Sequence, residues 1–70
     1  MKDNLDLAAS AQQLADAAPT GSIDHAAASS VAITLATTRD IAAARKTLDG
    51  VSPEEVRQAA LALFDRLSAE

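Results

Sequence analysis

The stretch SSVAITLATT, residues 29–38, decides between two folds for this chain. Its large apolar residues, Val31, Ile33 and Leu35, alternate with small or polar residues. Alternation with a period of two, in a segment rich in β-branched residues, is typical of a half-buried β-strand. The spacing therefore predicts a strand over residues 31–36.

A helix through the same stretch is the competing interpretation. Alanine favours helix, and no glycine or proline interrupts residues 23–49. The chain would then be an all-α module of three helices, over residues 4–18, 23–49 and 53–69. A possible capping box favours a break in this helix near Thr37. Thr37 can act as an N-cap, and Asp40, three residues later, can complete the box. We therefore expect a strand, followed by a separate helix over residues 38–49.

The segment TLDGVSPEEV, residues 47–56, predicts a hinge between two helices. Gly50 can end the first helix in the left-handed conformation that glycine accepts without strain. Ser52 is a good N-cap, and Glu55 stands three residues later, as a capping box requires. The hinge predicts a second helix over residues 53–68.

The helix after the hinge is amphipathic, since apolar residues recur on one face and Gln58, Ala62, Asp65 and Arg66 lie opposite. With the apolar residues of the strand and the first helix, this face forms the predicted dimer and core set. Its members are Val31, Ile33, Leu35, Ile41, Leu48, Val56, Ala60, Leu63, Phe64 and Leu67.

The composition predicts a core that is too small for the chain alone. Of 70 residues, 34 are apolar, but 18 of these are alanine. Large apolar burial provides most of the stabilisation in a small domain. We therefore expect a homodimer that shares its core. Residues 1–29, with Pro19 before Gly21 as a break, would form an acidic extension or linker, and residues 30–70 the dimerising domain.

Several classes of function are disfavoured. The chain contains no cysteine, tryptophan or tyrosine and carries a net charge of −4. Residues 26–38, the longest uncharged run, are too few to span a bilayer, so we expect a cytoplasmic protein without membrane contact. Ser22, Asp24 and His25 lie close in sequence, but a cap and an exposed histidine explain them better than a catalytic triad does. We predict no enzyme, no metal, no cofactor and no small-molecule substrate.

The order of strand, short helix, Gly-Val-Ser turn and amphipathic helix resembles the ribbon-helix-helix superfamily of small bacterial repressors and antitoxins. The residues that carry the resemblance are ITL (33–35), GVS (50–52), then Glu55 with Val56, the pair Ala60-Leu61, and Phe64. It covers residues 30–68. The resemblance implies a mainly α homodimer in which two strands pair into an antiparallel ribbon above four helices.

The resemblance also implies DNA contacts. The outward residues of the ribbon would read base edges, and the start of the second helix would hold a phosphate. In this chain those residues are Ser30, Ala32, Thr34, Val51 and Ser52. The chain departs from the family here, since the ribbon residues are short and uncharged and acids follow the hinge.

Two functions follow from these readings. The first is a homodimeric regulator of the antitoxin or repressor type, which binds a protein partner and, through the resemblance, operator DNA. The second is an acidic all-helical protein-interaction module, such as an adaptor, secretion chaperone, anti-sigma-like inhibitor or docking element, which binds no DNA. Secondary structure over residues 31–36 separates the two.

Overall fold

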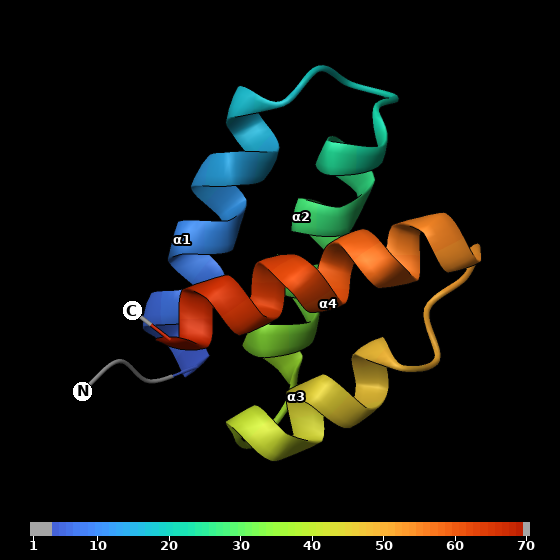
Figure 1. The fold of residues 1–70 in the computed structure, drawn as a ribbon. Coiled ribbons are helices and arrows are strands. Elements are labelled where there is room, and N and C mark those ends of the chain that lie inside the picture. The colour runs from blue at the N-terminus through green and yellow to red at the C-terminus, as the bar shows by residue number, and fades with distance from the viewer. Residues whose placement is uncertain (1–3, 70) are drawn as a thin grey trace.

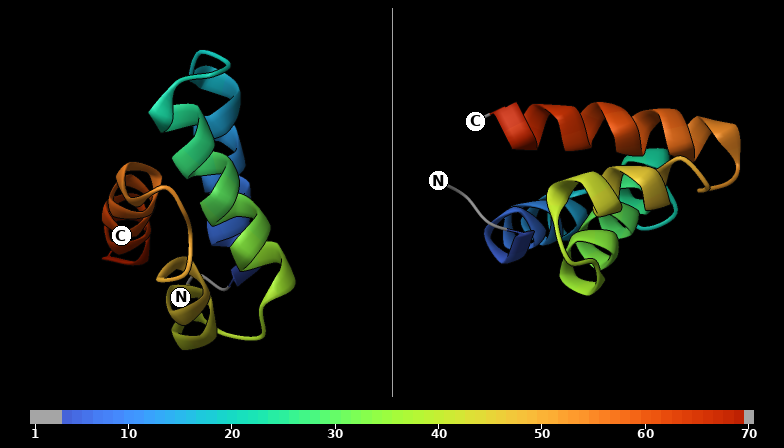
Figure 2. Two further views of the ribbon diagram at one scale, coloured as in Figure 1. Left: turned by 90° about the vertical axis from the view of Figure 1, so that its right-hand side faces the viewer. Right: turned by 90° about the horizontal axis from the view of Figure 1, so that it is seen from below.

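The computed structural model describes residues 4–69, and these residues form four α-helices in two layers. Helices α1 (Asn4–Ala17) and α2 (Ile23–Thr37) form an antiparallel hairpin, and α3 (Ile41–Leu48) follows at its open end (Figure 1). Helix α4 (Glu54–Ala69) crosses the hairpin as a second layer, as the view from below shows (Figure 2).

The strand predicted over residues 31–36 is wrong, because these residues lie inside α2. Ser22 caps this helix by accepting a hydrogen bond from the backbone N–H of His25 at 3.1 Å. Helical spacing places Val31 and Leu35 together on the buried face, whereas Ile33 points outward and is 63% exposed. A lone strand would have left its edges unpaired, while the helix satisfies its own backbone and still buries two large side chains.

The break between α2 and α3 lies about two residues later than predicted. Thr37 does not cap the following helix, since its hydroxyl donates to the carbonyl of Ile33 at 2.8 Å within the last turn of α2. The cap of α3 is Asp40, whose carboxylate accepts from the N–H of Ala43 at 2.8 Å. The predicted helix over residues 38–49 is therefore shortened to α3, and the continuous helix over 23–49 is also wrong.

The ribbon-helix-helix fold is contradicted as a whole. It requires a β-strand, and residues 4–69 contain none. The all-α alternative is closer, although it placed three helices where the structure has four. Only the order of α3, hinge and α4 resembles the family, and two helices joined by a short turn are common to many helical folds.

The core is built largely from alanine, which explains how a chain with few large apolar residues becomes compact. Among the residues described, 14 apolar residues are buried, and eight of them are alanines. Ala11, Ala44 and Ala60 are completely buried, so the helices approach one another closely at these points. Close contact recovers dispersion energy that a count of large side chains leaves out. The core includes residues of α1, so it draws on both residues 1–29 and residues 30–70.

The helix predicted over residues 53–68 corresponds closely to α4. Its first backbone hydrogen bond runs from the N–H of Arg57 to the carbonyl of Pro53 at 3.0 Å. The acidic residues of its first turn suit the positive end of the helix dipole. Gly50 does not adopt the left-handed conformation expected of it. The glycine with a positive φ, +90°, is Gly21 instead. The turn that needs glycine is therefore the one between α1 and α2.

Candidate binding pocket

The predicted core residues fall into three groups in the structure. Val31, Leu35, Leu48, Ala60, Phe64 and Leu67 are buried. Ile41, Val56 and Leu63 are partly buried. Ile33 is the exception, as it projects from the outer face of α2. Apart from Ile33, the predicted set therefore contributes to the interior of one chain.

The residues expected to contact DNA do not form one outward surface. Ala32 and Thr34 are buried in α2, and Ser30 is half-buried on the same helix. Val51 and Ser52 lie in the turn before α4, where Val51 packs against the core. Since the described residues contain no ribbon, the DNA contacts inferred from it lose their structural basis.

The polar residues of the α1–α2 turn serve the turn itself. The hydroxyl of Ser22 donates to the carbonyl of Pro19 at 2.7 Å, in addition to capping α2. The Nδ1 atom of His25 lies 2.8 Å from the carbonyl oxygen of Ala15, which joins the two helices. These contacts hold the end of α1 against the start of α2, and they shape one end of the pocket described next.

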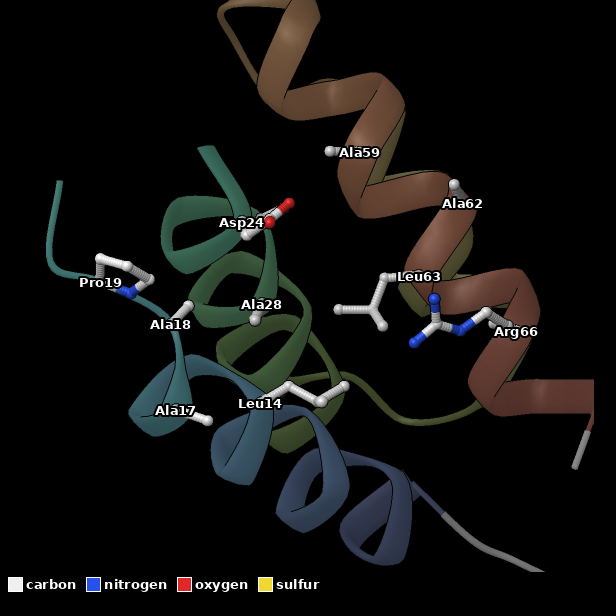
Figure 3. Close-up of a pocket in the computed structure, with 11 residues that line it drawn as sticks. Leu14, Ala17, Ala18, Pro19, Asp24, Ala28, Ala59, Ala62, Leu63 and Arg66 are labelled. Carbon is white, nitrogen blue, oxygen red and sulfur yellow. The ribbon is translucent and has the colours of Figure 1, made fainter. Parts of the chain in front are cut away.

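A pocket of about 590 Å³ lies between the closed end of the α1–α2 hairpin and the side of α4. It exists because α4 crosses the hairpin at an angle and leaves the turn end uncovered. Its walls are mainly small apolar side chains, shown with their neighbours in Figure 3. The lining residues are Leu14, Ala17, Ala18, Pro19, Asp24, Ala27, Ala28, Ala59, Ala62, Leu63 and Arg66.

Two faces of α4 have different partners. One face is in the core through Ala60, Phe64 and Leu67. The adjacent face lines the pocket with residues 59, 62, 63 and 66, which follow the i, i+3, i+4, i+7 spacing of a single helical stripe. This second face is only partly covered: Ala59 and Leu63 pack against the edge of the core and stay half-buried, whereas Ala62 and Arg66 are exposed.

Alanine makes the pocket hollow, and one large apolar residue remains open to solvent at its edge. Six lining residues are alanines, whose short side chains cannot fill the angle between the hairpin and α4. Leu14 is 38% exposed at this site, although it belongs to the same side of α1 as core residues. An added apolar group would therefore gain buried surface on several sides at once.

Opposite charges stand on facing walls of the pocket. Asp24 projects from the first turn of α2 toward α4, and Arg66 projects from α4 toward the hairpin (Figure 3). Both are exposed, and neither forms an ion pair with another residue of the described chain. Volume, apolar walls and a few polar groups at the edge are the features of a binding site.

Sequence reasoning missed this pocket. It placed Ala62 and Arg66 opposite the apolar face of the last helix, and it assigned residues 1–29, which include Leu14, to an acidic extension or linker. The sequence does contain a signal, since Ala59, Ala62 and Leu63 extend the apolar face of α4 beyond the width that one neighbour covers. The uncovered site itself depends on the crossing of α4 over the hairpin, which a linear pattern does not specify.

Other kinds of site find no support within residues 4–69. No group of three or more histidine and acidic side chains there is arranged to hold a metal ion. The helices described are too short or too polar to cross a membrane. Comparisons with protein-family models, curated proteins and solved structures found no match to this chain.

Proposed function

We propose that this chain is a small acidic protein-interaction module, and that it binds an apolar helix of a partner protein in the α1–α2–α4 pocket. The observation that carries the proposal is the apolar pocket beside the second face of α4. A helix laid along that face would contact residues 59, 62 and 63 on one side and the hairpin end on the other. Amphipathic helices commonly bind proteins in such grooves, with anchors at i, i+3, i+4 and i+7.

The alanine walls favour a helix with large apolar anchors. Small side chains let a second helix approach closely, at the 8–10 Å spacing typical of packed helices. Each leucine that becomes fully buried contributes roughly 1.5–3 kcal/mol before the costs of association are subtracted. After association costs of at least about 4 kcal/mol are subtracted, two or three anchors correspond to weak binding, with a dissociation constant on the order of 1 mM. Such an affinity suits an adaptor or docking element that exchanges partners.

A designed peptide can test the proposal without knowledge of the natural partner. The probe is an alanine-based helical peptide of about 18 residues, with leucines at i, i+4 and i+7 and uncharged glutamine on either side of them. We expect the peptide to bind the wild-type protein in a fluorescence anisotropy titration. The Ala62→Trp variant should bind at least tenfold more weakly, because the indole occupies the pocket from its wall.

Ala42→Trp is the matched control, since Ala42 is exposed on α3 and does not line the pocket. This variant should bind the peptide as the wild type does. Equal binding by Ala62→Trp and Ala42→Trp would show that the peptide does not use the pocket. Loss of binding in both would indicate a general effect of the tryptophan and would also count against the site.

A further inference from the structure

The charges at the pocket carry information about the partner, beyond the apolar fit. Two ion pairs form elsewhere among the described residues, Arg57 with Glu54 at 2.9 Å and Arg45 with Asp65, whereas other exposed charges such as Arg39 and Lys46 form none. Asp24 and Arg66 also form no ion pair in residues 4–69, and they differ from the other unpaired charges because they face the same pocket from different helices. They are the charged residues that line the pocket.

An apolar helix in the pocket would bring uncharged surface next to both charges and remove part of their water. Partial desolvation of a charge costs free energy unless an opposite charge replaces the water. A partner with one sign of charge throughout would satisfy one wall and repel the other. The two opposite charges at the pocket therefore favour a partner helix that carries both a positive and a negative side chain.

We infer that the partner helix presents one acidic and one basic residue on its docking face, on either side of the apolar anchors. The acidic residue would meet Arg66 and the basic residue would meet Asp24. This inference rests on the proposed function and adds the charge pattern of the partner. Either chain direction of the helix can satisfy it, provided that the two charges lie at opposite ends of the apolar face.

Four versions of the probe peptide test the charge pattern. They share the leucine anchors and differ at the two flanking positions, which are Lys and Glu, Gln and Gln, Lys and Lys, or Glu and Glu. An exposed ion pair changes affinity by up to about fivefold. We expect the Lys/Glu peptide to bind about five- to twentyfold more tightly than the Gln/Gln peptide. The Lys/Lys and Glu/Glu peptides should fall near Gln/Gln at 0.15 M salt, because attraction at one wall offsets repulsion at the other.

Reversal of one charge on the protein should move the preference in a defined way. In Arg66→Glu both walls are acidic, so the Lys/Lys peptide should become the tightest of the four. Arg39→Glu is the matched control, since Arg39 is exposed between α2 and α3 and does not line the pocket. This control changes the net charge equally and should keep the Lys/Glu preference.

The outcomes separate this inference from the function on which it rests. If all four peptides bind the wild type equally, the charge pattern is refuted while the pocket remains a docking site. If Arg39→Glu and Arg66→Glu shift to Lys/Lys together, net charge decides the preference and the inference is overturned. If no peptide binds, the proposed function itself fails.

Discussion

Two substitutions of similar size, Leu35→Ala and Ile33→Ala, should differ sharply in their effect on stability. In α2 the Leu35 side chain is 1% exposed within the core, whereas Ile33 is 63% exposed. Removal of a buried leucine side chain costs about 2.7–5 kcal/mol, since lost burial and a residual cavity add together. Ile33 is only about a third buried, so its truncation loses under ~1 kcal/mol of burial. The better helix propensity of alanine offsets part of that loss, by up to ~0.7 kcal/mol.

Urea denaturation followed by circular dichroism at 222 nm measures both effects. A domain of this size has a free energy of unfolding of roughly 4–10 kcal/mol. With an m-value near 1 kcal/mol/M, Leu35→Ala should lower the urea midpoint by about 3 M or leave the chain unfolded. Ile33→Ala should shift the midpoint by less than about 0.5 M. In a strand these two residues would share one face, so equal losses of stability would refute the helical assignment of residues 31–36.

Four further results follow, three from local backbone geometry and one from a surface ion pair. Gly21→Ala should destabilise the chain by about 1–2 kcal/mol, because a residue with a side chain is strained at φ +90°. Backbone strain is the whole of this cost, since the added Cβ meets no atom within 4 Å. Gly50→Ala should be neutral or stabilise by up to ~1 kcal/mol, since its φ is not positive and the Cβ contact at 3.5 Å is ordinary. Asp40→Ala should cost about 1 kcal/mol by removing the cap of α3. These three midpoints come from the same urea titrations, and a stabilising Gly21→Ala would contradict the turn geometry. A double-mutant cycle on Arg45 and Asp65, which are 51% and 55% exposed, should give a coupling below ~1 kcal/mol that shrinks in 1 M salt.

Capping and turn residues made the positions of the helices partly predictable. The hinge signals placed the last helix within about one residue at each end, because a proline and an amphipathic pattern agree there, although α4 shows no side-chain cap from Ser52. The end of α1 is likewise marked by Pro19 and Gly21. These signals act over a few residues, so they can be recognised without knowledge of the tertiary structure.

Residues 31–36 were misjudged because their alternation is compatible with two structures. Val31 and Leu35 stand at positions i and i+4, a spacing that places two side chains on the same face of either a helix or a strand. Ile33 alone distinguishes the two, and an exposed isoleucine is unexceptional on a protein surface. The balance is decided by α1 and α4, which cover the helical face, and this tertiary contribution is not visible in the local sequence.

Within one chain, alanines make up much of the buried core, a contribution that a count of large apolar residues leaves out. Where helices cross closely, each buried alanine contributes contact with several neighbours although its own surface is small. The same property produces the pocket, because the short side chains of the lining alanines leave a hollow where the hairpin and α4 diverge. Whether an alanine face packs or remains open depends on the path of α4, so neither the core nor the pocket could be read from composition.

The most direct test of the account is a methyl NMR titration of the labelled protein with the Gln/Gln peptide. We expect chemical-shift changes to concentrate on pocket methyl groups, those of Leu14, Ala59, Ala62 and Leu63, and to leave Ile33 on the outer face of α2 unchanged. Such a pattern would place an apolar helix in the α1–α2–α4 pocket. Shifts centred on Ile33, or an unchanged spectrum at millimolar peptide, would contradict the claim that this pocket is the binding surface of the protein.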